Sequence, residues 1–213
     1  MRLTRSAIPV VFRPQHTVEL PTHVTGDIRH GKVRRMPKRE RVPPAKKLTR
    51  EALERAALRY LDQFDTSAEN LRRVLERQVR RVQRQVEPDL AERAFGIIEE
   101  LIGRYKGSGL LNDERYAENL ASSLRRRGAS GRAIAHKLAA RGVDASAVTE
   151  ALTRADRDSE DAELDAARAF ARRRRLGPHR AAEERAARRD RDLAALARAG
   201  FGFDVARRAL DEE

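Results

Sequence analysis

The chain has 213 residues and no cysteine, which excludes a disulfide framework and a thiolate zinc site and is compatible with a reducing cytoplasm. Aromatic residues make up only 4% of it, so the core must consist mainly of Leu, Ile, Val and Ala, and no apolar run approaches the roughly 18 residues that a membrane helix needs. We therefore expect a soluble, cytoplasmic protein without a membrane partner. The net charge of +13 is concentrated in residues 1–48, which hold 12 Lys/Arg against 3 Asp/Glu, whereas the rest holds 34 against 30.

Residues 1–48 predict a disordered basic arm. They contain six of the eight prolines, have no sustained apolar periodicity and end in the spacer PPAKK. Only VVF, at residues 10–12, indicates a docking element. A basic arm favours polyanions through counterion release, while the near-balanced charge of the rest argues against a protein that simply coats DNA.

Residues 49–109 predict three helices. The first begins behind Thr49, a good N-cap, and the second begins near Ser67. Pro88 breaks the second helix and suits the first turn of the third, which ends at Gly107 and Gly109. This third helix has the broadest apolar face in the chain, made of Leu90, Ala94, Ile97, Ile98, Leu101, Ile102 and Tyr105.

Residues 110–155 contain three further helix signals, each with its own start and stop. Asn112 caps a helix that ends at Gly128, Ser130 begins one that ends at Gly142, and Asp144 caps the third. Connections of two or three residues are typical of a packed helical bundle. The buried faces are expected to contain Tyr116, Leu120, Leu124, Ile134, Leu138, Val148, Ala151 and Leu152.

Residues 156–213 begin with an acidic connector, from which Ser159 caps a helix that Gly177 and Pro178 stop. A long charged helix from about Ala181 to Gly200 and a short one over residues 204–211 follow. Shifting the sequence by 58 residues superimposes the middle and last segments, including Leu138 on Leu196, Gly142 on Gly200, Val143 on Phe201, and Leu152 on Leu210.

This internal repeat predicts an all-α fold, an elongated tandem array of three three-helix repeats with a disordered basic N-terminal arm. The expected boundaries are 1–48 for the arm, 49–109 for a divergent first repeat, 110–155 for the second repeat and 156–213 for the third.

The sequence contains no catalytic constellation, and we expect neither enzyme activity nor a cofactor or metal. Residues 26–33 (GDIRHGKV) match a phosphate-binding loop up to Lys32, but Val33 replaces the Ser/Thr that would hold Mg²⁺ and no strand precedes the match. The seven-residue spacing of His16, His23 and His30 lacks other ligands nearby. The acidic residues between Asp156 and Asp165 are best explained as a solvated helix N-terminus.

Basic residues instead gather in two clusters. Solvated helix surface and the negative end of the helix dipole explain part of this pattern. Their presence in two adjacent repeats nevertheless predicts a basic strip suited to phosphates or to an acidic protein groove. The candidate partner-binding or DNA-binding residues are Arg125, Arg126, Arg127, Arg132, Lys137 and Arg141 in the middle repeat and Arg172, Arg173, Arg174, Arg175 and Arg180 in the third.

The segments LLNDERYAENLASSLRRRGASGRAIAHKLAARGVD, RRRRLGPHR and LAALARAGFGFDVARRAL resemble the RecX family, regulators of the RecA recombinase. The resemblance covers about residues 49–211. It implies three tandem three-helix units that lodge in the groove of the RecA filament on single-stranded DNA, contacting DNA directly or through the filament. It further implies inhibition of ATP hydrolysis, strand exchange and co-protease activity in DNA repair and the SOS response.

By the same resemblance, one set of signature residues is mainly structural: Leu111, Asp113, Tyr116, Ala117, Gly128, Gly142, Gly200 and Phe201. Ala199 departs from the family, because many relatives have a basic residue there, and this weakens the contacts expected of the third repeat. The basic arm has no counterpart in the family. We expect a monomer.

Two alternatives remain. A DNA-binding protein would use the helix that contains Ile134–Leu138 and its neighbour as a helix-turn-helix, although the second helix of that pair, Ala145–Leu152, has no basic residue with which to contact DNA. A purely structural helical scaffold would affect no DNA transaction at all.

Overall fold

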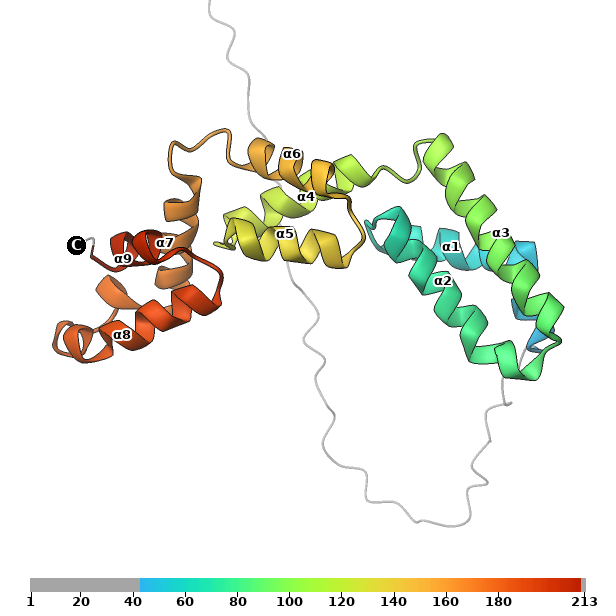
Figure 1. The fold of residues 1–213 in the computed structure, drawn as a ribbon, viewed down its shortest axis with the longest axis horizontal. Helices are drawn as coiled ribbons and strands as arrows, with labels where there is room; N and C mark the ends of the chain where they lie inside the picture. The colour runs from blue at the N-terminus through green and yellow to red at the C-terminus, as the bar shows by residue number, and fades with distance from the viewer. Residues whose placement is uncertain (1–42, 212–213) are drawn as a thin grey trace, which may run out of the picture. The chain divides into compact units, whose positions relative to one another are not determined.

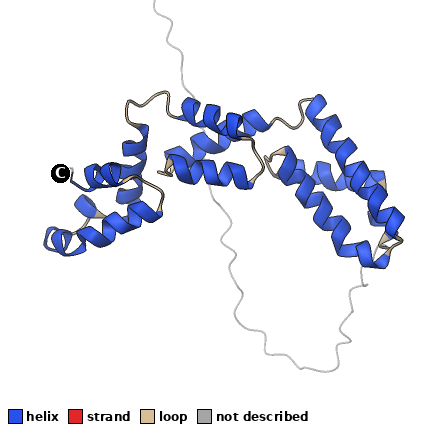
Figure 2. Ribbon diagram, in the orientation of Figure 1, coloured by secondary structure: helices blue, strands red, loops and turns tan. Residues whose placement is uncertain are grey.

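A computed structural model describes residues 43–211 (Figure 1). The chain divides into two units, residues 1–41 and 42–213, and every described residue belongs to the second. All regular elements in this described part are helices, with no strand among them, which confirms the predicted all-α class (Figure 2). The VVF segment, the phosphate-loop match and His16, His23 and His30 lie outside the described residues.

The first group of helices comprises α1 (Arg50–Gln63), α2 (Ala68–Val82) and α3 (Pro88–Gly107). The hydroxyl of Thr49 accepts a hydrogen bond from the amide of Ala52, and that of Ser67 accepts one from the amide of Asn70. These side chains satisfy amides that the first turn of a helix leaves without partners, and Pro88 begins α3 because its missing amide costs nothing there. The three predicted helix starts are therefore confirmed.

The core of this group begins before α1. Residues 45–47 form a short 3₁₀ turn, Ala45–Lys47, and Leu48 behind it is 1% exposed and packs into the same hydrophobic cluster as Leu53. We expected residues up to 48 to belong to the arm, but this last apolar side chain belongs to the core. A second 3₁₀ turn, Gln83–Gln85, follows α2.

The second group comprises α4 (Asp113–Arg126), α5 (Gly131–Ala140) and α6 (Ala145–Ala155). The side chains of Asn112, Ser130 and Asp144 cap the three helices as predicted. Gly128 and Gly142 follow α4 and α5 with φ of 73° and 77°. Glycine adopts this left-handed backbone without the steric cost that a Cβ would impose, so both positions end their helices.

The third group comprises α7 (Ala162–Arg174), α8 (Ala182–Arg198) and α9 (Phe203–Asp211), with a 3₁₀ turn at Gly177–His179. The predicted start of α7 was wrong: Asp161 caps it, while the hydroxyl of Ser159 donates to Asp165, 2.7 Å away. Asp161 is favoured because its carboxylate also pairs with Arg208 of α9 at 2.8 Å.

The predicted end of α7 was wrong as well. The helix ends at Arg174, and Arg175 takes the left-handed conformation with φ 54°. Here the amide of Leu176 donates to the carbonyl of Ala171 at 2.9 Å, and Leu176 is 6% exposed. Burial of this leucine fixes the end of the helix before Gly177 is reached, because the apolar contact and the backbone bond act together.

One kind of contact, a hydrogen bond from a buried serine to a helix-terminal carbonyl, joins successive helix groups. Ser67 at the start of α2 donates from its hydroxyl to the carbonyl of Arg141 at the end of α5, and Ser130 at the start of α5 donates to the carbonyl of Ala199 at the end of α8. Both serines are 0% exposed. Each satisfies an amide of its own helix and a terminal carbonyl of a helix in the next group. We call these two contacts the serine junctions. That the chain consists of three repeats stays a prediction.

Candidate partner-binding surface

Arg125 lies inside the fold. Its side chain is 10% exposed, and its guanidinium donates to both carboxylate oxygens of Asp156 at 2.7 Å and to Glu163 at 2.6 Å. A further bond at 3.0 Å reaches the carbonyl of Ala129. Burial alone would lower the pKa of Arg125, but hydrogen bonds with Asp156 and Glu163 raise it above its ordinary value. This side chain joins the end of α4 to the connector and α7, and its donors are occupied.

The acidic connector therefore has a structural role beyond a solvated helix N-terminus. Besides binding Arg125, Glu163 accepts a hydrogen bond from the amide of Gly131 at 3.0 Å, close to the start of α5. Asp156 and Glu163 together surround one guanidinium with two carboxylates from different elements. The prediction that the acidic residues between Asp156 and Asp165 are purely solvated was thus incomplete. Two of them, Asp156 and Glu163, bind the largely buried side chain of Arg125.

Arg126 and Arg127 are exposed, and neither has a side-chain partner among residues 43–211. The end of α4 packs closely on α7 beside them: a Cβ at Gly128 would lie 2.8 Å from the carbonyl of Ala166 and from the amide nitrogen of Phe170. The guanidinium of Arg173 donates to the carbonyl of Arg127. The structure thus brings the ends of the two predicted basic clusters together, although Arg127 and Arg173 are 46 residues apart in sequence.

Arg173 and Arg174 both lie over the ring of Phe170, each with its guanidinium carbon 5.7 Å from the ring centroid. Both cations are thus attracted to the same aromatic ring of α7. We name Arg126, Arg127, Arg173 and Arg174 the α4–α7 arginine cluster. Arg172 and Arg175, which are also exposed, flank it in sequence.

The remaining basic residues of the middle group do not join this cluster. Arg132 and Lys137 are exposed on α5, and Arg132 lies beside Gly200, near one serine junction. Arg141 is half-buried and contributes its carbonyl to the other junction, at the opposite end of α5. The predicted basic strip is therefore divided along this helix.

Arg180 has a structural partner. Its guanidinium forms two hydrogen bonds of 2.8 Å with Asp192, a carboxylate that is 1% exposed. The amide of Gly177 donates a third bond at 2.9 Å. Hydrogen bonds from Arg180, opposed by burial and helped by this amide, hold the pKa of Asp192 below its ordinary range. Because the side chain of Arg180 neutralises this buried charge, it is poorly placed to bind a partner.

One further basic site was not predicted from the sequence. Lys47, Arg77 and Arg81 line a groove of about 410 Å³ on the surface of α2, together with Val74, Gln78 and Val82. Neither Arg77 nor Arg81 has an ion pair within the described part of the chain. The i, i+4 spacing of these arginines on one helical face was the available signal. It was obscured because other arginines of α2, such as Arg72, alternate with them and pair with glutamates instead.

The described residues contain no group of side chains suited to hold a metal ion, and none of their helices is long and apolar enough to cross a membrane. In α6, the second helix of the helix-turn-helix alternative, Arg154 pairs with Glu118 of α4 and with Glu150 at 3.6 Å. The structure therefore adds no free cation to this helix in favour of that alternative.

Comparison with known proteins gives a consistent set of relatives. The family model described as "RecX, second three-helix domain" matches residues 112–152. A regulatory protein RecX from Myxococcus xanthus is 44% identical over 178 residues, which cover 82% of this chain and 92% of the relative. Those from Agrobacterium fabrum and Corynebacterium efficiens are each 36% identical, over 49% and 54% of this chain and 53% and 58% of the relatives. No solved structure gives a match.

Proposed function

The chain belongs to the RecX family of regulatory proteins, and from this premise we propose that it binds the RecA filament on single-stranded DNA and lowers its activity. The activities affected are ATP hydrolysis, strand exchange and the co-protease function, in DNA repair and the SOS response. The protein acts as a monomeric, non-enzymatic modulator and contacts DNA directly or through the filament.

The observation that carries this proposal is the α4–α7 arginine cluster. Its four guanidinium groups come from two helix groups, and the hydrogen bond from Arg173 to the carbonyl of Arg127 joins the ends of α4 and α7 that bear them. A cluster of cations without carboxylate partners attracts phosphates and acidic protein surfaces, and arginine binds both in a bidentate manner. We do not propose Arg125 and Arg180 as contact residues. Arg125 is paired with Asp156 and Glu163, and Arg180 is paired with Asp192.

The serine junctions supply the second requirement, a fixed spacing between surfaces on different groups. Both buried serines couple the start of one helix to the end of another by direct hydrogen bonds. A ligand that contacts neighbouring filament subunits at a set spacing binds one subunit arrangement better than others. It therefore shifts the filament toward that arrangement, here one that turns over ATP slowly.

The test is single-stranded-DNA-dependent ATP hydrolysis by the cognate RecA while this protein is titrated from sub-stoichiometric to equimolar amounts. We expect the rate to fall. A fall that is complete at low ratios indicates binding at filament ends, and a fall proportional to the ratio indicates binding along the filament. An unchanged rate with folded protein contradicts the proposal and favours direct DNA binding, which a recombinase-free duplex titration with a salt series then measures.

A further inference from the structure

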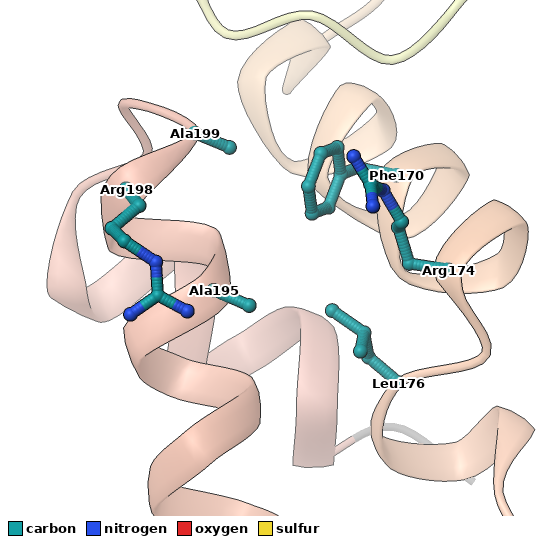
Figure 3. Close-up of a pocket in the computed structure, with 6 residues that line it drawn as sticks. All are labelled: Phe170, Arg174, Leu176, Ala195, Arg198 and Ala199. Carbon is teal, nitrogen blue, oxygen red and sulfur yellow. The ribbon is translucent and has the colours of Figure 1, made fainter.

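The third helix group contains a pocket with apolar walls and a charged opening. Of the residues that line it, only Arg174 belongs to the α4–α7 arginine cluster proposed for the filament contact. It has a volume of about 470 Å³ and lies between α7 and the end of α8. In Figure 3 the side chains of Phe170, Ala195, Ala199 and Leu176 converge on its centre from two sides. Pockets of roughly 300–1,000 Å³ hold ligand groups of the size of a large side chain or more.

The wall of this pocket is held in place by the core. Phe170 packs edge-to-face on buried Phe201 with ring centroids 5.9 Å apart, and Leu176 is 6% exposed. Ala199 is fixed because its carbonyl accepts the hydrogen bond from Ser130 at 2.7 Å. The cavity is therefore preformed by contacts that a ligand does not have to make, which lowers the entropic cost of binding.

Two arginines border the opening. Arg174 rises from α7 and Arg198 from α8, so that their guanidinium groups lie on opposite sides of the apolar centre (Figure 3). Both are exposed, and neither forms an ion pair with any residue in the range 43–211. Cations on both sides of an apolar cavity favour a ligand that has carboxylates on both sides of an apolar group.

The chemistry of the wall argues against a nucleic acid base as the occupant. Apart from the two arginines at the rim, the side chains that line the pocket are hydrocarbon only. A base inserted here would lose the water bound to its polar edges without gaining replacement bonds in the apolar centre.

Residues 1–42 of this chain are an equally poor occupant, because they hold 10 Lys/Arg against 3 Asp/Glu and would be repelled by the two arginines at the opening.

We propose that this pocket binds an acidic segment of a partner protein, which inserts one phenylalanine or leucine side chain and places flanking carboxylates on Arg174 and Arg198. The apolar side chain fills the space between Phe170, Leu176 and Ala195, while the guanidinium groups fix the direction of the segment. This inference goes beyond filament inhibition, and its test contains no recombinase, so that the two proposals succeed or fail separately.

The test measures the fluorescence anisotropy of a labelled peptide against the full chain. The probe has one central phenylalanine with three glutamates on each side; one comparison peptide has alanine at the centre, and another has glutamines in place of the glutamates. We expect the probe to bind about tenfold or more tightly than the alanine peptide, as burial of one aromatic side chain implies. Equal binding of the probe and the alanine peptide overturns the proposal.

Three variants locate the site. Ala195→Leu fills the cavity without changing the charge, and we expect it to weaken probe binding about tenfold while leaving the alanine peptide unaffected. The double variant Arg174→Glu with Arg198→Glu should abolish probe binding, because it replaces attraction by repulsion at the rim. The double variant Arg55→Glu with Arg59→Glu, on exposed α1 surface outside this pocket, gives the same change in net charge and should bind normally.

Circular dichroism establishes that each variant keeps the helical content of the parent. Normal probe binding by Ala195→Leu, or equal losses in the α1 double variant and the pocket double variant, would place the interaction elsewhere and overturn the proposal. So would displacement of the probe by an oligothymidylate of equal charge as effectively as by the unlabelled peptide, because the pocket would then be a polyanion site.

Discussion

Ser130 donates a hydrogen bond from its hydroxyl to the carbonyl oxygen of Ala199, 2.7 Å away, and so joins the start of α5 to the end of α8. The same hydroxyl accepts a bond from the amide of Ala133 at 3.2 Å. Ser130→Ala removes both bonds, and we expect the free energy of unfolding to fall by about 1–2 kcal/mol. Urea denaturation measures the change; Ser122→Ala, on α4 and without a hydrogen bond from its hydroxyl within the described residues, is the control and should shift stability by less than about 0.5 kcal/mol. Equal effects of the two substitutions would contradict the structural role of the junction.

Gly128 allows the close approach of α4 and α7. Alanine there would require both a left-handed backbone and a Cβ 2.8 Å from two backbone atoms of α7, which cannot move independently of the helix. We expect Gly128→Ala to lower the free energy of unfolding by about 2 kcal/mol or more. In contrast, Gly103→Ala, in the interior of α3 where a Cβ meets nothing within 4 Å, should raise it by about 0.5–1 kcal/mol. Thermal unfolding of both variants tests the opposite signs.

Asp192 makes stability depend on acid pH. Its pKa in the fold lies below the value of about 3.9 for an unfolded chain, mainly because of Arg180. The stabilisation is therefore fully present above that value, and it is lost as the pH falls through it toward the folded-state pKa. We expect the temperature of the unfolding midpoint to fall as the pH is lowered below about 4. Asp192→Asn should make this fall shallower. A midpoint series with the same pH slope for both proteins would exclude this group as the cause.

Arg175 has a left-handed backbone that costs a non-glycine residue about 1 kcal/mol or more. Its side chain is exposed and has no ion pair within the described part of the chain. We therefore expect Arg175→Gly to raise the free energy of unfolding by about 1 kcal/mol. The substitution Arg174→Gly, one residue earlier and inside α7, is the matched control and should be destabilising. Chemical denaturation of the pair distinguishes backbone strain from loss of charge.

Charge reversal tests the α4–α7 arginine cluster. Arg126→Glu, Arg127→Glu and Arg173→Glu replace exposed cations. The last removes the hydrogen bond to the carbonyl of Arg127, but the close packing at Gly128 and the ion pairs of Arg125 still join α4 to α7, so the protein should remain folded. We expect the concentration needed for half-inhibition of RecA ATP hydrolysis to rise about tenfold or more. Triple reversal of Arg55, Arg59 and Arg207, exposed residues outside the cluster, gives the same change in net charge and should have little effect. Equal inhibition by the cluster variant and the parent would remove the cluster from the mechanism.

Several helix boundaries could be predicted because their causes are local. Thr49, Asn112 and Asp144 satisfy amides three residues further on, and Gly142 supplies a left-handed backbone at one position. Such signals need no knowledge of the fold. The boundaries of α7 were predicted less well, since Asp161 and Arg175 derive their roles from contacts with α9 and from burial of the neighbouring Leu176.

The candidate partner-binding surface, like the helix boundaries, could be predicted only in part from local sequence. Composition and spacing identified the arginine-rich helix ends, but every arginine in a run looks alike in sequence. Only packing decides that Arg125 is enclosed by two carboxylates while Arg126, its neighbour, faces outward. The partner of Arg125, Asp156, is 31 residues away, a separation at which no local rule applies.

The sequence by itself thus determined the helical class, most of the helix starts and the family, because caps, apolar spacing and glycine stops act within a few residues. The tertiary structure alone decided which cations are free, how Ser67 and Ser130 join successive helix groups, and where a pocket opens between α7 and α8. These properties depend on side chains and carbonyls brought together from as many as 74 residues apart, and their electrostatic and steric consequences follow only from the distances in the folded chain.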